Sequence, residues 1–116
     1  ETVPNSRLTT DADPALSYAY CSDTVFDPRV AEAVRGVDLL YHESTYDSSL
    51  EAKARQRGHS TAAQAGKIAA MAGVHTLILG HFSQRYSSVD ILVEEASREF
   101  PNVIAARDGL RIDICR

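Results

Sequence analysis

The chain has 116 residues, 44% of them hydrophobic, and a formal net charge of −4. This length predicts one domain or part of one. The negative charge argues against a small, strongly basic nucleic-acid-binding module, and it leaves open a nuclease whose basic surface lies elsewhere in a larger protein. No apolar run approaches the roughly 20 residues that a membrane-spanning helix needs, so we expect no membrane segment.

The two ends and the cysteines carry further expectations. The first residue is Glu1 and the only methionine is Met71, so we expect that an upstream part is missing. Residues 1–14 are polar and turn-forming, which predicts a loop or linker. Cys21 and Cys115 are too few for a secreted disulfide framework. Both lie in apolar stretches, so we expect buried free thiols, with a disulfide between them as the alternative.

Short apolar runs alternate with helical periodicity along the chain. We expect strands at residues 15–21, 38–42, 76–80 and 103–106. We expect helices at residues 27–36, 60–73 and from Ser87 or Ser88 to Phe100, with a loop and a short solvated helix at residues 45–58. Asp108-Gly109 then predicts a hairpin into an edge strand at residues 110–114. This order predicts the α/β class, with a mostly parallel sheet and a terminal β-hairpin.

Local signals support two of the helices. Asp27 followed by Pro28 is typical of a helix start, and Gly36 suits a left-handed cap at that helix's end. Thr61 and Gln64 have the spacing of a capping box. These residues therefore predict where each helix begins or ends.

Four polar motifs follow buried strands or open a helix. In chain order they are Ser22-Asp23-Thr24, His42-Glu43-Ser44-Thr45, Gly58-His59-Ser60-Thr61 and His81-Phe82-Ser83-Gln84-Arg85-Tyr86. Functional side chains in α/β folds gather beyond the carboxyl ends of the strands. We therefore expect the four motifs to surround one site.

Together these motifs resemble the carboxyl-terminal half of ribonuclease Z, the tRNA 3′-processing endonuclease family of the metallo-β-lactamase fold. The resemblance runs from about Leu16 onward, and the His81 to Tyr86 block is its most specific part. It implies that residues 15–116 form the carboxyl-terminal half of an αβ/βα sandwich with helices on one face. It also implies two zinc ions and a precursor-tRNA substrate in the intact enzyme, a homodimer and a cytoplasmic location.

The resemblance implies metal-binding roles for Asp23 and His81. Asp23 would bridge two zinc ions, since each carboxylate oxygen can bind a different cation, and His81 would be a ligand of one zinc ion. Neutral imidazole is a common zinc ligand. Without the resemblance, the more common roles would be a cap or turn former for Asp23 and a hydrogen-bonded polar residue at a strand end for His81.

The resemblance implies catalytic roles for His59 and Glu43. His59 would contact the scissile phosphate and stabilise the transition state or protonate the leaving oxygen. Glu43, from the neighbouring strand end, would hold the imidazole in one tautomer. The alternative for His59 is a hydrogen-bonding residue at a helix terminus. We expect His42, on the opposite sheet face from Glu43, to be structural, and His75 to be exposed and inert.

Basic and polar residues near these motifs could bind substrate. By resemblance, Ser83 and Arg85 help to shape the pocket for the RNA end, since arginine can hold a phosphate through two hydrogen bonds. They could equally pack the loop and brace Asp23. Lys53, Arg55 and Arg57 could contact an RNA backbone, or form a solvated face.

The family's first metal motif, His-x-His-x-Asp-His, is absent from this chain. One Asp and one His are poor ligation for a zinc pair, so we expect few or no zinc ions and no activity in the isolated chain. The missing amino-terminal half would normally cover one face, so we also expect self-association. The alternatives are another hydrolase of this fold, such as a phosphodiesterase or an arylsulfatase-like enzyme, or a non-catalytic α/β module.

Overall fold

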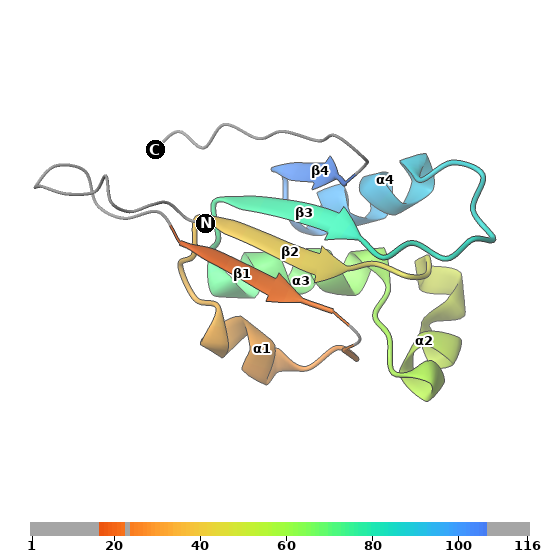
Figure 1. The fold of residues 1–116 in the computed structure, drawn as a ribbon, viewed down its shortest axis with the longest axis horizontal. Coiled ribbons are helices and arrows are strands. Elements are labelled where there is room, and N and C mark those ends of the chain that lie inside the picture. Colours follow the sequence, from red (N-terminus) through yellow and green to blue (C-terminus); the bar gives the residue numbers. More distant parts are fainter. Residues whose placement is uncertain (1–16, 23, 107–116) are drawn as a thin grey trace, which may run out of the picture.

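The structure is a computed structural model that describes residues 17–22 and 24–106. Strands alternate with helices along the described chain, which confirms the predicted α/β class (Figure 1). The predicted linker at 1–14 and the predicted terminal hairpin lie outside the described residues. The elements are β1 (Tyr18–Cys21), α1 (Pro28–Ala33), β2 (Leu39–Glu43), η1 (Ser48–Leu50), α2 (Glu51–Arg57), α3 (Ala62–Ala72), β3 (Thr76–Gly80), α4 (Asp90–Glu99) and β4 (Val103–Ala105).

The four described strands form one sheet in the order β1-β2-β3-β4. Every neighbouring pair is parallel, with Tyr41 of β2 lying between Tyr20 of β1 and Ile78 of β3. Parallel pairing brings the carboxyl ends of all four strands to the same edge of the sheet (Figure 1). The polar motifs that follow β1, β2 and β3 therefore start from one edge.

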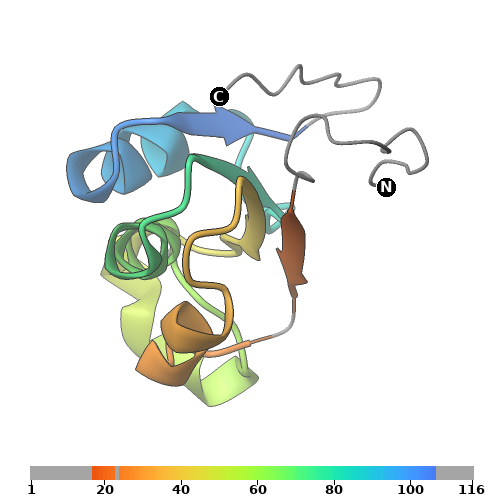
Figure 2. The same cartoon turned by 90° about the vertical axis from the view of Figure 1, so that its left-hand side faces the viewer.

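Helices α1, α3 and α4 cover one face of this sheet, as Figures 1 and 2 show. The central helix α3 is rich in alanine, and Ala62, Ala65 and Ala69 are fully buried. A Cβ on Gly66 would lie 2.7 Å from the backbone oxygen of Ala96, so glycine allows α3 to approach α4 closely. Ile68 is also buried in this layer, and burial of such a side chain stabilises the fold by about 1.5–3 kcal/mol.

The predicted capping box at the start of α3 is confirmed. The Thr61 hydroxyl accepts the Gln64 backbone N–H at 3.1 Å, and the Gln64 amide oxygen accepts the Thr61 N–H at 2.9 Å. The predicted N-cap of α1 is also confirmed, because the Asp27 carboxylate accepts the Arg29 backbone N–H at 3.0 Å. The first turns of α1 and α3 are thus hydrogen-bonded as the sequence predicts.

Two predicted helix ends are wrong. Gly36 does have a left-handed backbone, with φ of +73°, but α1 ends earlier, at a C-cap on Val34. The N-cap of α4 is Val89, with no side-chain cap, and not Ser87 or Ser88. The Ser88 hydroxyl instead accepts a hydrogen bond from the backbone N–H of Asp90 at 3.2 Å, one residue outside the cap position.

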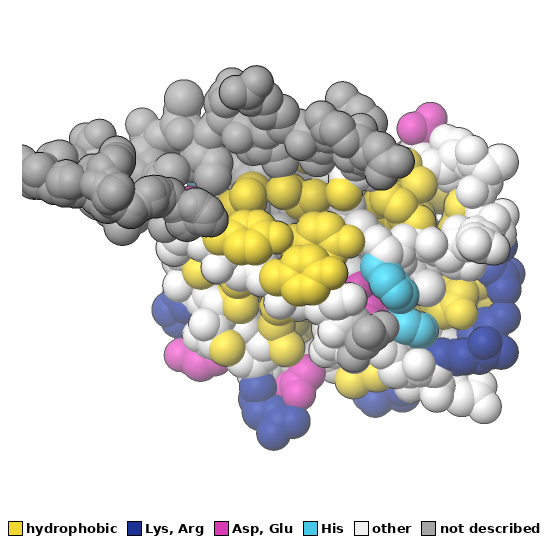
Figure 3. Space-filling view, in the orientation of Figure 1, with side chains coloured by type: hydrophobic (Ala, Val, Ile, Leu, Met, Phe, Trp, Pro, Cys, Tyr) yellow, Lys and Arg dark blue, Asp and Glu magenta, His cyan; other side chains and the backbone are white. Residues whose placement is uncertain are grey.

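The opposite face of the sheet carries aromatic side chains and is covered by none of the described helices (Figure 2). Tyr18 and Tyr20 are 53% and 62% exposed, and Tyr20 stacks on Tyr41 with ring centroids 4.6 Å apart. Figure 3 shows hydrophobic side chains gathered over the strands on this face. Among the described residues, no helix has both the length and the apolar character that crossing a membrane requires.

Candidate active site

The centre of the site is the carboxylate of Glu43, which lies at the end of β2 and is fully buried. Its Oε1 accepts the backbone N–H of Thr24 at 2.6 Å. Its Oε2 accepts the hydroxyl of Thr45 at 2.7 Å, the backbone N–H of Ser60 at 3.0 Å and Nδ1 of His59 at 3.0 Å. Four donors from three segments therefore converge on one carboxylate, an arrangement that suits its ionised form.

His59 lies between α2 and α3 and contacts Glu43 directly. Gly58 ends α2 in a left-handed conformation, with φ of +79°, and the His59 backbone N–H then donates to the Ala54 oxygen at 2.8 Å. The side chain is 22% exposed, while the Glu43 side chain is 0% exposed. The turn after Gly58 thus directs one ring nitrogen of His59 to the buried carboxylate and leaves part of the ring at the surface.

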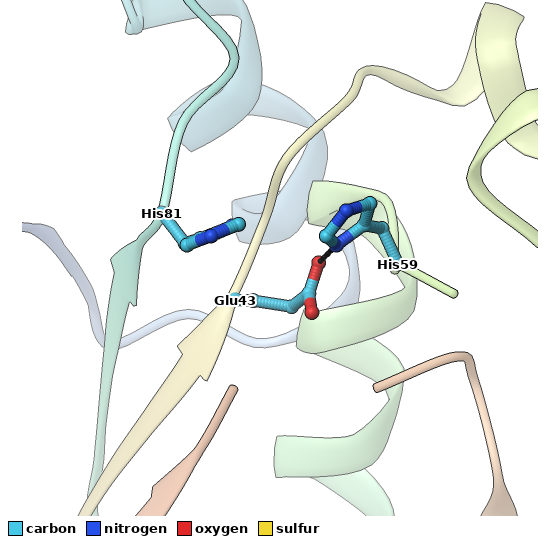
Figure 4. A group of neighbouring side chains, drawn as sticks. All are labelled: Glu43, His59 and His81. Atoms are coloured by element: carbon cyan, nitrogen blue, oxygen red, sulfur yellow. Dashed lines mark hydrogen bonds and ion pairs between the residues drawn. The ribbon is translucent and has the colours of Figure 1, made fainter. Parts of the chain in front are cut away.

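His81 approaches the same carboxylate from the end of β3. Among the described residues other than glycine, it alone has a positive φ, of 59°. A non-glycine residue in this conformation costs about 1–3 kcal/mol, and such strain clusters at functional sites. Its Nδ1 lies 3.0 Å from Oγ1 of Thr45, and its ring centroid lies 5.3 Å from that of His59. Figure 4 shows the two imidazoles pointing toward each other above Glu43.

These three residues could contribute to a metal site. Glu43, His59 and His81 each offer one ligand atom, and these atoms lie within 4.8 Å of one another. Two imidazoles and a carboxylate suit zinc. Glu43, however, already accepts hydrogen bonds on both oxygens, so it is better placed to orient the histidines than to bind a cation. The predicted bridging ligand, Asp23, lies outside the described residues.

Gly80 allows the chain to pass Tyr41 just before His81. A Cβ built on Gly80 would overlap the Tyr41 ring and its hydroxyl oxygen. The Tyr41 hydroxyl also hydrogen-bonds to the backbone of His81, and burial is the main cause that raises the pKa of this phenol. Glycine at the end of β3 thus lets the aromatic face of the sheet reach the backbone that carries His81.

A basic rim, which we define as Lys53, Arg57 and Arg85, lies beside the histidines. Nζ of Lys53 and Cζ of Arg85 lie 5.7 and 5.6 Å from the ring centroid of Tyr46, which in turn lies 6.3 Å from the His59 ring. The positive charge of Arg85, then burial and the charge of Arg57, lower the pKa of Lys53. In Figure 3 basic side chains lie next to the two histidines.

The segment after His81 is braced by hydrogen bonds. The Ser83 N–H donates to the Thr45 backbone oxygen at 3.1 Å, and the Ser83 hydroxyl accepts from the Arg85 N–H at 3.3 Å. The Asp47 N–H donates to the Tyr86 hydroxyl at 2.7 Å. Ser83 and Tyr86 therefore hold this segment against the chain that follows β2, while Arg85 is exposed.

The other histidines and Cys21 lie apart from the Glu43 network. His42 is 1% exposed, its Nδ1 donates to the Glu43 backbone oxygen at 2.8 Å, and its Nε2 has no hydrogen-bond partner within the described ranges. Burial lowers the pKa of His42, so the ring is neutral. His75 is exposed, as expected. Cys21 is a half-buried free thiol whose pKa is raised by burial, and Cys115 lies outside the described residues.

Two residues at the site have contacts that were not predicted from the sequence. Thr45 links Glu43 to His81, and Tyr46 is a buried aromatic residue beneath the basic rim. Thr45 is two positions after Glu43 in the same motif, and in an extended chain this spacing places both side chains on the same side. The sequence had no comparable signal for the cation contacts of Tyr46.

Solved structures similar to this chain define its fold. The metallo-β-lactamase fold protein YhfI from Bacillus subtilis matches 78% of this chain and 37% of its own length, with a TM-score of 0.72 and 27% sequence identity. The short form of human tRNase Z matches 75% of this chain and 28% of its own, with a TM-score of 0.58 and 32% identity. The chain therefore has the fold of part of a metallo-β-lactamase-fold protein, as predicted.

Curated sequences show which proteins the chain resembles in sequence. The chain is 51% identical over 114 residues to "Ribonuclease Z" of Bacteroides fragilis (strain YCH46), and 47% identical over 112 residues to "Ribonuclease Z" of Porphyromonas gingivalis (strain W83). These matches cover 98% and 97% of this chain, and 38% and 37% of the relatives. No family model matches the chain. The chain is thus similar to proteins named ribonuclease Z over nearly its whole length and spans less than half of theirs, which confirms the predicted resemblance.

Proposed function

We propose that this chain is part of a zinc-dependent endoribonuclease that cleaves precursor tRNA at its 3′ end. One observation carries the proposal: the buried Glu43 carboxylate holds Nδ1 of His59 at 3.0 Å beside His81, at the carboxyl ends of neighbouring parallel strands. The likeness to proteins named ribonuclease Z supports the choice of RNA as substrate. The first mechanistic step is then the placement of the scissile phosphate against the imidazoles.

His59 is the group that acts on the phosphate. Its Nδ1 contacts Glu43, so Nε2 is the nitrogen directed toward a substrate. Glu43 stabilises the imidazolium whenever Nε2 holds a proton, which lets His59 donate a hydrogen bond to the phosphate and pass the proton to the leaving oxygen. Such a positioned acid contributes about 10²–10⁴-fold to the rate.

His81 and Asp23 are the residues of this chain that would hold zinc. A bound metal would polarise the phosphate and lower the pKa of a water molecule. The donor types fit zinc, since imidazole and carboxylate are both common ligands. A zinc pair needs more ligands than these two residues provide. We therefore expect further ligands from the rest of the intact protein, and few or no zinc ions in the isolated chain.

The basic rim and a neighbouring cavity would bind the RNA. Arg85 and Lys53 can neutralise backbone phosphates, and Ser83 keeps the segment of Arg85 in place. A cavity of about 500 Å³ adjoins His59 on the other side and could take a nucleotide. It is lined by Val25, Phe26, Glu51, Ala52, Arg55, His59 and Gln64.

The remaining length of the relatives suggests what covers the aromatic face. Tyr18, Tyr20 and Tyr41 leave an apolar surface on the sheet, and the curated relatives are more than twice as long as this chain. We propose that the rest of the intact protein packs on this face as the second half of an αβ/βα sandwich. The isolated chain would then be inactive and prone to self-association. A homodimeric, cytoplasmic intact enzyme remains our expectation from the family.

The test is cleavage of precursor tRNA by the intact protein and its His59→Ala and His75→Ala variants. His75 is an exposed histidine outside the Glu43 network and so serves as the matched control. We expect His59→Ala to lower kcat by at least about a hundredfold, and His75→Ala to leave it unchanged. Equal activity of all three proteins would contradict the proposed role of His59 at the scissile phosphate.

A second candidate keeps the fold and changes the substrate. The likeness to YhfI, whose name states a fold and no substrate, supports the fold alone, so a different phosphodiesterase or another hydrolase of this fold is the second candidate. The same three proteins should therefore be assayed on a small phosphodiester such as bis(4-nitrophenyl) phosphate. Cleavage of the small diester without cleavage of precursor tRNA would support this second candidate.

A further inference from the structure

We infer that Thr45 is a positioning residue that fixes the tautomer of His81 and thereby presents the Nε2 atom of His81 to the metal. The inference rests on the metal-binding role proposed for His81 and adds a role for Thr45, to which the sequence analysis assigned none. Thr45 is 6% exposed and lies between Glu43 and His81. Its hydroxyl lies within hydrogen-bond distance of both Oε2 of Glu43 and Nδ1 of His81.

The positions of the oxygen and nitrogen atoms determine where the hydrogens lie. An ionised carboxylate only accepts, so the hydrogen between Oγ1 of Thr45 and Oε2 of Glu43, 2.7 Å apart, belongs to the threonine. A hydroxyl has one hydrogen and two lone pairs. Toward Nδ1 of His81, 3.0 Å away, Thr45 can therefore only accept. Nδ1 of His81 must carry a hydrogen, and in the neutral ring Nε2 is the nitrogen with the lone pair that can bind a metal.

The backbone of Thr45 is held firmly enough for this task. Its N–H donates to the Ser60 oxygen at 3.1 Å, and its carbonyl accepts the Ser83 N–H at 3.1 Å. One of these segments carries His59, and the other follows His81. Backbone hydrogen bonds to both segments thus hold Thr45 in place, and these bonds fix the position of its hydroxyl.

This arrangement separates the two histidines chemically. Nδ1 of His59 donates directly to Glu43 Oε2, so its tautomer does not need Thr45. Loss of the Thr45 hydroxyl should therefore change the tautomer of His81 and leave that of His59 unchanged. A purely structural role for Thr45 would alter both rings or neither.

The test compares Thr45→Val, which has the same shape without the hydroxyl, with Thr45→Ser, which keeps the hydroxyl. The first readout is the tautomer of each histidine in the metal-free intact protein, from side-chain ¹⁵N NMR at about pH 9, where imidazole is ordinarily neutral. We expect the hydrogen of His81 on Nδ1 in the unmodified protein and in Thr45→Ser, and on Nε2 in Thr45→Val.

The second readout is zinc affinity, measured by competition with a chromophoric chelator. We expect Thr45→Val to bind zinc about 10- to 100-fold more weakly, and Thr45→Ser to stay close to the unmodified protein. A hydrogen on Nε2 of His81 in the unmodified protein would overturn the inference even if Thr45→Val does not fold. Unchanged tautomer and zinc affinity in Thr45→Val would overturn it as well. Neither readout uses RNA, so failure to cleave precursor tRNA would contradict the proposed function alone.

Discussion

The two histidines beside Glu43 are held in different ways. His59 contacts the buried carboxylate directly, and its backbone continues into the capped N-terminus of α3. His81 is exposed, contacts the Thr45 hydroxyl that donates to this carboxylate, and has a left-handed backbone with φ of 59°. The two imidazoles, whose centroids are 5.3 Å apart, therefore differ in these contacts: His59 bonds to a carboxylate and His81 to a hydroxyl.

This difference indicates a division of labour. A carboxylate partner stabilises an imidazolium, which suits a residue that gives a proton to a leaving oxygen. A hydroxyl partner fixes the tautomer without adding a charge, which suits a neutral metal ligand. We therefore assign the phosphate to His59 and the metal to His81. The substitutions below test the shared carboxylate first and the surroundings of each histidine afterwards.

The largest expected effect comes from Glu43→Gln. The amide keeps the shape but loses the charge on which four donors converge, and charge-assisted hydrogen bonds contribute about 1.5–3 kcal/mol each. We expect precursor-tRNA cleavage by the intact protein to fall by at least about a hundredfold, and its thermal midpoint to drop. Glu94→Gln, at an exposed glutamate on α4 that pairs with Arg98, is the control. Near-normal cleavage by Glu43→Gln would contradict the shared role of the carboxylate.

Gly80→Ala tests the side of the site that carries His81. The added methyl group would overlap the Tyr41 ring, and such overpacking costs about 1–3 kcal/mol. We expect a lower free energy of unfolding in a urea titration, and weaker zinc binding because the backbone of His81 shifts. The double variant Gly80→Ala with Tyr41→Leu should recover part of both losses. No recovery in the double variant would show that the ring is not the cause.

Arg85→Ala and Lys53→Ala test the basic rim next to both histidines. We expect each change to raise KM for precursor tRNA with little change in kcat, and to reduce the slope of log affinity against log salt by about 1. Arg35→Ala, at an exposed arginine on α1 that is paired with Glu32, is the control. An unchanged salt slope in both rim variants would mean that neither cation contacts a backbone phosphate.

The smallest expected effect concerns His42, the neighbour of Glu43 on β2. Burial lowers the pKa of His42 in the folded protein, so below about pH 6.5 the unfolded state binds more protons than the folded state. The contribution of His42 to the free energy of unfolding is therefore complete above about pH 6.5. It decreases as the pH drops toward the lowered folded-state pKa, by up to about 1.4 kcal/mol per pH unit. The measurement is the free energy of unfolding against pH. His42→Gln should flatten this slope, and an identical slope would refute the assignment.

Much of the fold could be predicted from local patterns. The apolar runs of β2 and β3 and the capping box of Thr61 and Gln64 each depend on neighbours in sequence, so the sequence predicted them. The predicted start of α4 was wrong: two adjacent serines each offered a good cap, but the helix begins beyond both of them, with Val89 as its N-cap. Turn chemistry alone does not decide between such neighbours.

The candidate site was predicted in part. The contact of His59 with Glu43 was expected because both follow or precede elements at the same sheet edge. The link between Thr45 and His81 joins residues 36 positions apart, and it depends on a left-handed backbone that no local signal indicates at a histidine. Geometry of this kind comes from packing around the site, so only the structure shows it.

The most direct test of the division of labour is the zinc content of the intact His59→Ala and His81→Ala proteins, purified side by side. We expect His81→Ala to contain less zinc per chain than the unmodified protein, and His59→Ala to contain as much. Equal zinc loss in both variants, or loss in His59→Ala alone, would contradict the assignment of the metal to His81 and of the phosphate to His59.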